Sequence, residues 1–201
     1  MLLRTTKAAL VATLVAAGTL AGGGASPPAG EAWTIDPAHA DVVFRIDHLG
    51  YSATWGRFGE VTGTLAFEED NPEDARVEAV MAAASIDTNH AERDRHLGGD
   101  DFFKVDSFPE VTFRSTAIEV TGESSANITG QLTMLGVTRP VVLAATLNKV
   151  APHPRDAATL IAGFSATTSI QRSDWGITYG VPVIGDQVDI FLDIEATKPA
   201  E

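Results

Sequence analysis

VVFRIDH, at residues 42–48, places its apolar side chains two residues apart along the chain. In an extended strand, successive side chains point to opposite faces, so every second residue shares a face. Val42, Phe44, Ile46 and His48 therefore lie on one side of the segment. The pattern predicts a β-strand with one largely apolar face.

The same period of two recurs along most of the remaining chain. The further runs lie at residues 61–67, 77–83, 111–117, 128–134, 141–147, 160–170 and 188–196. Turn signals such as Thr121-Gly122 and Leu135-Gly136 separate them. Eight strands at this spacing predict a sandwich or a closed barrel, and closure is the arrangement that leaves no strand edge exposed. We expect an all-β fold, an extended eight-stranded antiparallel β-barrel.

One segment interrupts the strand pattern. Residues 90–97 are rich in charged residues compatible with a helix, and two glycines at 98 and 99 follow as a stop signal. Two aspartates at 100 and 101 can cap a second turn that brings Phe102 and Phe103 to the core or to the mouth of the barrel. We expect a short helical insertion near residues 90–103.

The N-terminus has the features of an export signal. Arg4 and Lys7 give a positive start, residues 8–17 give a short apolar run, and small residues follow through Ala25. This run is too short to span a bilayer comfortably, and no later stretch reaches the roughly 18 apolar residues of a membrane helix. We expect a cleaved signal at residues 1–25, a loose arm at 26–32, and one barrel domain at 33–198.

Charge and cysteine content exclude several classes of function. The chain has 14 Lys and Arg against 27 Asp and Glu, a formal charge of −13 that becomes −15 once Arg4 and Lys7 are removed. Such a surface repels nucleic acid and anionic lipid headgroups. The chain has no cysteine, so thiol catalysis, disulfides and cysteine-bound zinc are excluded.

Small residues on the inward faces leave two interpretations of the interior open. An eight-stranded barrel is about the size at which side chains either fill the interior or leave room for one small ligand. Small side chains would leave space, but they can equally mark bulges or close strand packing in a solid core. The positions concerned are Gly63, Ala79, Ala83, Gly130, Ala145 and Ala162.

Nine short segments, in this order and spacing, give the sequence a recognisable resemblance to a known family. They are WTIDPAH (33–39), FRIDHLG (44–50), WGRFG (55–59), SIDT (85–88), RDRHL (93–97), DFF (101–103), FPEVTFRS (108–115), GQLTMLGVT (130–138) and RSDWG (172–176). The chain resembles the YceI family of polyisoprenoid-binding, or lipid-binding, proteins. It departs from the family pattern at Ala40, where serine is frequent, and at Trp175, where phenylalanine is frequent, and both changes would alter the pocket.

The resemblance implies a lipocalin-like barrel around an apolar tunnel that holds a long isoprenoid chain or a similar amphiphile. Family members are commonly exported to the periplasm and have been linked with isoprenoid quinones, stress responses and membrane cytochromes. We therefore expect a periplasmic or secreted, non-enzymatic binding protein without a covalent cofactor. Its ligand would be an isoprenoid quinone, a polyprenyl phosphate or another long-chain lipid.

A long ligand suits an apolar tunnel better than a short one. Burial of a methylene contributes about 0.8 kcal/mol, whereas association costs an estimated 4 to 15 kcal/mol. Roughly ten or more buried carbons are therefore needed for useful affinity. The residues that we expect to line the tunnel are Phe44, Leu65, Phe67, Phe113, Leu132 and Met134, with Phe58, Phe102, Phe103 and Trp175 near an opening.

His48 is a separate candidate, because it shares a face with Phe44 and Ile46. Its imidazole could hydrogen-bond a quinone carbonyl or another headgroup. The alternative is an ordinary histidine at a strand end, bonded to solvent or backbone.

Other polar clusters have structural interpretations. The segment RDRH at 93–96 has neither the His-Glu-x-x-His pattern nor paired ligands on one helical face, so we expect its charges to tie the helix to its neighbours. His39, with Asp36 and Asp41, is expected to organise the entry of the first strand. No metal site and no catalytic site is predicted, and no phosphate loop, dinucleotide fingerprint or Gly-x-Ser-x-Gly motif is present.

Two other classes of function remain as alternatives. One is an enzyme, a hydrolase or isomerase that uses His48 or His96 in the same cavity. The other is an interaction module that docks on a membrane cytochrome or pairs with a second copy as a homodimer. Its docking patch would comprise Val80, Ile118 and Phe191, which fall opposite the main apolar faces.

Overall fold

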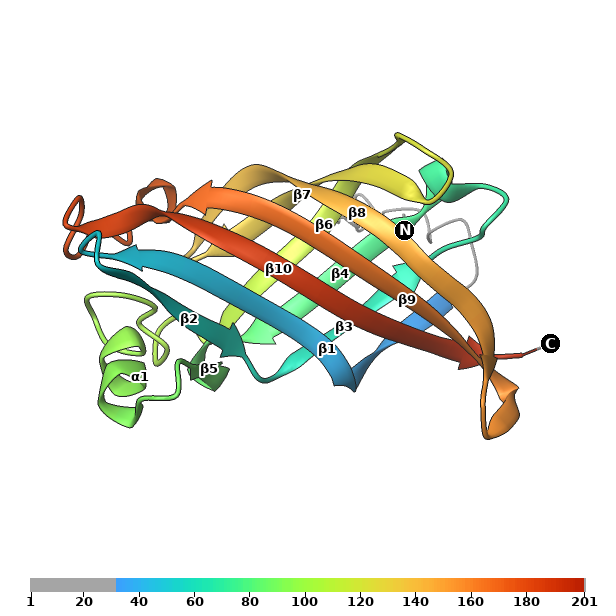
Figure 1. Cartoon of the computed structure of the whole chain (residues 1–201), viewed down its shortest axis with the longest axis horizontal. Coiled ribbons are helices and arrows are strands. Elements are labelled where there is room, and N and C mark those ends of the chain that lie inside the picture. Colours follow the sequence, from blue (N-terminus) through green and yellow to red (C-terminus); the bar gives the residue numbers. More distant parts are fainter. Residues whose placement is uncertain (1–31, 201) are drawn as a thin grey trace, which may run out of the picture.

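The computed structural model describes residues 32–200, which form ten strands rolled into a barrel (Figure 1). The predicted export signal lies outside the described residues, as does the predicted arm except for Ala32, the first residue of β1. The strands are β1 (Ala32–His48), β2 (Ser52–Phe58), β3 (Val61–Ala66), β4 (Arg76–Ala82), β5 (Ile86–Asp87), β6 (Glu110–Val120), β7 (Ser125–Met134), β8 (Val137–His153), β9 (Asp156–Gln171) and β10 (Ile184–Pro199).

Eight of these strands close the barrel, in the order β1, β3, β4, β6, β7, β8, β9 and β10. Closure comes from β1, which pairs antiparallel with β10 from Thr34↔Thr197 to His48↔Ile184. The other neighbours in this ring also pair antiparallel. The prediction of an eight-stranded antiparallel barrel is confirmed, because the eight strands correspond to the eight alternating runs.

The sequence pattern missed β2 and β5, which extend one side of the barrel. The C-terminal part of β1 pairs with β2 (Val42↔Phe58), whereas its first residues pair with β3 (Trp33↔Leu65). The two strands therefore continue one another along β1, and β5 adds two residues to β2. In SATWGRF, the sequence of β2, alternation is weak because a glycine stands at position 56.

The helical insertion is confirmed and lies at one end of the barrel. Helix α1 (Ala91–Leu97) begins after His90, whose Nδ1 accepts a hydrogen bond from the Arg93 amide (3.2 Å), and ends at Gly98. Turns follow α1, as expected, and they bring Phe102 and Phe103 against the core. Figure 1 shows α1 beside β5 and below β2, at the left end of the barrel in this view. No helix of the described residues is long and apolar enough to cross a membrane.

A register shift in β6 overturns one prediction about faces. The pairing of β6 with β7 slips between Ser115 and Ala117, so the strand carries an extra residue there. As a result Ala117 is exposed, while Ile118 points into the barrel and lines its cavity. The predicted outer patch of Val80, Ile118 and Phe191 is therefore wrong at Ile118, whereas Val80 and Phe191 do not line the cavity.

The barrel has two distinct ends, which we call the helix end and the acidic end. The helix end carries the β1–β2 turn (49–51), the segment with α1 (88–109), the β7–β8 turn (135–136) and the β9–β10 connection (172–183) with the 3-10 helix η3 (Arg172–Trp175). The acidic end carries the β3–β4 connection (67–75), with the 3-10 helix η1 (Pro72–Asp74), and the β6–β7 and β8–β9 turns. A third 3-10 helix, η2 (Ala83–Ser85), links β4 to β5.

Candidate ligand-binding site

A cavity of about 470 Å³ lies inside the barrel and reaches both of its ends. The inward side chains of the alternating strands form its wall, so most of the lining is aliphatic or aromatic. Exposed residues of both ends also belong to the lining, including His96 at the helix end and Glu123 at the acidic end. The space is an apolar tunnel of ligand-binding size.

Ten of the eleven predicted ligand-binding residues line this cavity. Their role in binding stays a prediction, but the structure brings them to one surface from distant parts of the chain. They are Phe44, His48, Phe58, Leu65, Phe67, Phe102, Phe103, Phe113, Leu132 and Met134.

Trp175 is placed differently from the prediction. Its side chain is buried, at 3% exposure, and is not among the residues that line the cavity. The indole Nε1 donates to the Leu132 carbonyl (3.1 Å), which ties η3 to β7. Trp175 therefore anchors the β9–β10 connection to the barrel wall.

Two of the aromatic rings that line the cavity pack directly against glycines. A Cβ on Gly130 would lie 2.3 Å from Cζ of Phe113, and a Cβ on Gly56 would lie 2.3 Å from Cζ of Phe44. Each ring thus occupies the space that a side chain would need. Ala79 and Ala145, in contrast, line the open cavity, so the small residues serve both of the roles that the sequence left open.

The part of the wall formed by β8, β9 and β10 is mostly aliphatic, and the sequence prediction did not name its residues. They occupy alternate positions on β8, β9 and β10, so the period of two that identified the strands could also have identified them. The main ones are Val141, Leu143, Leu147, Phe164, Val188, Ile190, Leu192 and Ile194.

Polar side chains gather where the cavity meets the helix end. His48, Thr54, Thr88 and Arg93 all line the cavity there. Arg93 donates from Nε to Oγ1 of Thr88 and from Nη2 to its carbonyl, both at 2.7 Å. Arg93 thus ties α1 to the strand region, as predicted for this charged segment, but through Thr88 rather than through a carboxylate.

Asp94 adds to the hydrogen bonds that Arg93 makes between α1 and Thr88. Its Oδ1 accepts a hydrogen bond from the Thr88 amide (2.9 Å) and another from the Thr88 hydroxyl. Partial burial alone would raise the pKa of Asp94, but these hydrogen bonds outweigh it and hold the pKa below its ordinary value. The hydrogen bonds of Arg93 and Asp94 with Thr88 hold the cationic side chain of Arg93 at the edge of an apolar cavity.

An aromatic cluster borders the same end. The rings of His96, Phe102 and Tyr179 lie with centroids 5.1 to 5.3 Å apart, and all three line the cavity. His96 Nε2 lies 2.9 Å from Oδ2 of Asp101. This cluster joins the α1 segment to the β9–β10 connection across the mouth.

The acidic end of the cavity differs in charge. Glu69 and Glu123 belong to its lining, together with Arg76, whose Nη1 donates to the carbonyls of Asp74 and Ala75. The cavity therefore has His48, Arg93 and two threonines at the helix end, and two carboxylates with one arginine, which is bonded to backbone carbonyls, at the other. An amphiphile with an anionic or hydrogen-bond-accepting head would be favoured with its head at the helix end.

Arg172 holds the β9–β10 connection in place. The side chain is buried, at 4% exposure, and donates to four backbone carbonyls: those of Gly185 (2.8 Å), Ile177 (3.2 Å), Tyr179 (2.9 Å) and Ile184 (3.3 Å). Burial lowers the pKa of Arg172, while the nearby Asp186 opposes the shift. The planar guanidinium suits this set of acceptors, because it offers five donors in fixed directions.

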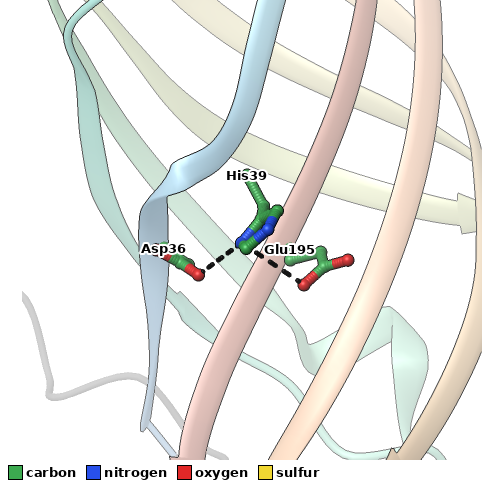
Figure 2. A group of neighbouring side chains, drawn as sticks. All are labelled: Asp36, His39 and Glu195. Carbon is green, nitrogen blue, oxygen red and sulfur yellow. Dashed lines mark hydrogen bonds and ion pairs between the residues drawn. The ribbon is translucent and has the colours of Figure 1, made fainter.

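A second polar cluster, outside the cavity, consists of Asp36, His39 and Glu195 (Figure 2). It forms where β1 bulges against β10, between Ile35 and Ala40. His39 Nδ1 lies 2.7 Å from Asp36 and 3.8 Å from Glu195. The hydrogen bond with Asp36 is the main cause that raises the pKa of His39 and lowers that of Asp36.

These three residues have donor atoms within 4.8 Å of one another, of the types that bind divalent metal ions. A proton shared between His39 and Asp36 accounts for their hydrogen-bond distance. The ring of His39 is 61% exposed on the outer surface. The geometry agrees with the predicted role in organising the start of the first strand.

Comparison with known proteins gives consistent results. The model of the YceI-like domain matches residues 33–196. The UPF0312 protein of Ectopseudomonas mendocina is 41% identical over 160 residues, which cover 80% of this chain and 83% of the relative.

Solved structures agree with this relationship. The YceI protein of Campylobacter jejuni is 30% identical, with a TM-score of 0.66 over 78% of this chain and 90% of the other. A polyisoprenoid binding domain from Saccharophagus degradans, implicated in plant cell wall breakdown, shares the fold at 14% identity, with a TM-score of 0.65 over 83% of this chain and 98% of that one. From the family match and the extent of these similarities, the chain belongs to the YceI-like domain family.

Proposed function

We propose that the chain is an exported, non-enzymatic binding protein that encloses one long-chain isoprenoid or a similar amphiphile, as a carrier or reservoir. The observation that carries this proposal is the apolar cavity of about 470 Å³, which reaches both ends of the barrel. Such a cavity favours ligands that are long and apolar, because each buried methylene contributes about 0.8 kcal/mol.

The two ends of the cavity give the ligand an orientation. Arg93, His48 and two threonines line the helix end, whereas two glutamates line the other, together with Arg76, whose guanidinium is bonded to backbone carbonyls. A quinone carbonyl or a polyprenyl phosphate would find hydrogen-bond donors at the helix end and repulsion at the acidic end. The proposed ligand therefore enters with its tail toward the acidic end, and its head stays beside Arg93.

The comparisons support the ligand class at the level of the fold. The neighbour from Saccharophagus degradans is a polyisoprenoid binding domain with the same barrel. We extend this ligand class to the present chain because its own cavity has the required apolar lining. Residues 1–25 support export to the periplasm or beyond, through their signal-like pattern.

The two alternative functions that the sequence left open, an enzyme and an interaction module, stay predictions. His48 lines the cavity, and His96 is bonded to Asp101 and packed between two aromatic rings. The proposal of a binding protein rests on the apolar lining of the cavity, since the contacts of the two histidines do not by themselves assign a reaction. Nothing in the described residues favours a membrane cytochrome as partner or a homodimer.

Two neighbouring alanines on β8 allow a direct test. Ala145 lines the cavity and pairs with Ala166, which lines it too, whereas Ala144 is exposed on the outer wall. Ala145→Phe should displace at least two methylenes of the ligand and weaken binding about tenfold or more. Ala144→Phe should bind like the unchanged protein.

The measurement is the amount of a long-chain isoprenoid quinone retained after loading from detergent micelles and gel filtration. Far-UV circular dichroism checks that both variants fold. Equal retention by a folded Ala145→Phe variant and by Ala144→Phe would contradict binding inside the barrel.

A further inference from the structure

Two neighbouring loops at the helix end carry no charged residue. They are the β1–β2 turn at residues 49–51 and residues 176–183 of the β9–β10 connection. Pairing of His48 with Ile184 brings them side by side. In a chain whose residues are 20% charged, this uncharged stretch is a distinct surface.

These loops expose apolar side chains to an unusual extent. Tyr51 is 90% exposed, Val183 64%, Tyr179 47% and Leu49 42%. Together they make up half of the large hydrophobic side chains that are exposed in residues 32–200. We call these four residues the apolar lip. Exposed apolar groups gathered in this way mark a surface that contacts another apolar phase.

The opposite end of the barrel has the contrary character. The β3–β4 connection holds an acidic run, with Glu68, Glu69, Asp70, Glu73 and Asp74. The difference gives the molecule a polarity along its long axis. The acidic end is suited to water, whereas the lip is a part of the described surface that is suited to an apolar environment.

The lip lies next to the opening of the cavity. Tyr179 belongs both to the lip and to the cavity lining, and His48 and Ile184, which precede and follow the two loops, also line the cavity. A molecule that crosses the lip therefore reaches the polar side chains of Arg93 and His48, which line the cavity at the helix end.

Two carboxylates that flank the lip loops in the sequence make local hydrogen bonds. Asp47 accepts a hydrogen bond from the Gly50 amide (2.9 Å), and Asp186 accepts bonds from the amide and hydroxyl of Ser173. The α1 segment beside the lip carries charges of both signs. With a formal charge of −13, the chain as a whole is repelled by anionic lipid, so a neutral bilayer surface fits best.

We propose that the apolar lip docks the open end of the barrel on the surface of a zwitterionic lipid bilayer, so that the ligand passes between bilayer and cavity without crossing water. This inference rests on the proposed function, because the bilayer is the phase in which a long isoprenoid dissolves. Tyrosines suit the purpose, since their rings favour the interface between lipid and water. Docking is shallow and reversible, because it uses only a few side chains.

The test uses the full mature chain and the double variant Tyr51→Ser/Val183→Ser. Neither residue lines the cavity, and both are highly exposed, so the variant should fold and keep its binding capacity. Val142→Ser is the matched control, because Val142 is 49% exposed but lies on β8, away from the lip. Phosphatidylcholine vesicles that contain a long-chain isoprenoid quinone supply the ligand, and detergent micelles supply it in a parallel series.

The double variant should extract quinone from vesicles about tenfold more slowly, or worse, than the unchanged protein. Val142→Ser should match the unchanged protein, and all three should load equally from micelles. Flotation with quinone-free vesicles should also fall in the double variant alone.

Equal extraction from vesicles by all three proteins would overturn docking while leaving the proposed function in place. The lip could instead mediate association of two copies. A dimer that is lost in the double variant, with no change in extraction, would overturn docking as well. If no protein takes up quinone from either source, the proposed function fails, and flotation alone decides docking.

Discussion

Gly130 lies beneath the ring of Phe113, and this contact is central to the shape of the cavity wall. A Cβ on Gly130 would meet Cζ of Phe113 at 2.3 Å and the Arg114 carbonyl oxygen at 2.8 Å. The oxygen belongs to a paired strand and cannot move easily. A single methyl group would therefore push the ring out of its seat and strain the sheet.

Gly130→Ala should lower the free energy of unfolding by about 1 to 3 kcal/mol, the usual range for overpacking. Gly163→Ala is the control, because its nearest neighbour would be Cβ of Asn148 at 3.9 Å, an ordinary contact. Urea unfolding of both variants measures the difference. A Gly130→Ala variant as stable as Gly163→Ala would show that the ring of Phe113 does not depend on this seat.

His39 gives the folded chain a pH dependence. The hydrogen bond with Asp36, with the charges of Glu195 and Asp41, raises the pKa of His39 above its ordinary value. The folded state then binds its proton more tightly than the unfolded state does. The stabilisation is fully present below the unfolded pKa of about 6.5 and is lost as the pH rises through the folded pKa.

His39→Gln should therefore be more destabilising at about pH 5.5 than at about pH 8.5. Urea unfolding of this variant and of the unchanged protein at both pH values measures the effect. In the background of Asp36→Asn, most of the pH-dependent difference should disappear, because that carboxylate is the largest cause. A difference that is the same at both pH values would refute the role of this pair.

At the scale of elements, the β9–β10 connection depends on one buried side chain. Arg172 donates to four carbonyls in and next to this segment and so stabilises a loop that has little regular structure of its own. A lysine keeps the charge but cannot reproduce the planar set of donors. Several of these carbonyls, one in a buried bond and three in part-buried bonds, would then lose their partner, which is unfavourable for each of them.

Arg172→Lys should lower the free energy of unfolding by at least about 2 kcal/mol and speed hydrogen exchange selectively at residues 176–183. Arg139→Lys serves as control, because Arg139 is exposed and donates one bond to the neighbouring Asp174 carbonyl (3.2 Å). Its effect should be below about 0.5 kcal/mol. Unchanged exchange in Arg172→Lys would mean that the loop is held by other contacts.

The strands also show how far the alternation of the sequence could predict the fold. It identified all eight barrel strands, because each buries one face in the lumen. It missed the reversal in β6, although the apolar residues shift from odd positions up to Phe113 to even positions at Ile118 and Val120. That change of phase was the visible signal of the bulge. It missed β2 because Gly56, where a ring of Phe44 is seated, removes a side chain from the pattern.

At the scale of the whole molecule, closure of the barrel decides the site. The inward faces of the alternating runs predicted seven of the ten lining residues, since they depend only on local alternation; Phe58, Phe102 and Phe103 lie outside those runs. The polar side chains at the helix end of the cavity and the apolar lip could not be predicted from alternation. Both arise only when β1 pairs with β10 and brings His48 beside Ile184. Arg93 was predicted to have a structural role, and the structure shows that its side chain also lies at the edge of the cavity.

Closure also explains why the two ends of the barrel differ. The lip is separated from the β8–β9 turn by the full length of β10, about 50 Å along its 16 residues. The α1 segment is separated from the acidic β3–β4 connection by the shorter β4, about 23 Å along its 7 residues. A long ligand can therefore have its head and tail in different electrostatic surroundings. This separation is the physical basis for the proposed orientation.

Native mass spectrometry of the mature chain, purified from its own host, tests the central claim most directly. A bound long-chain isoprenoid should appear as one added mass per chain, which organic extraction then releases and identifies. Ala145→Phe should carry less of it, and Ala144→Phe should carry the same amount. A clean mass of the chain alone, together with no uptake of added isoprenoid quinone or polyprenol, would contradict the claim that this barrel is a carrier.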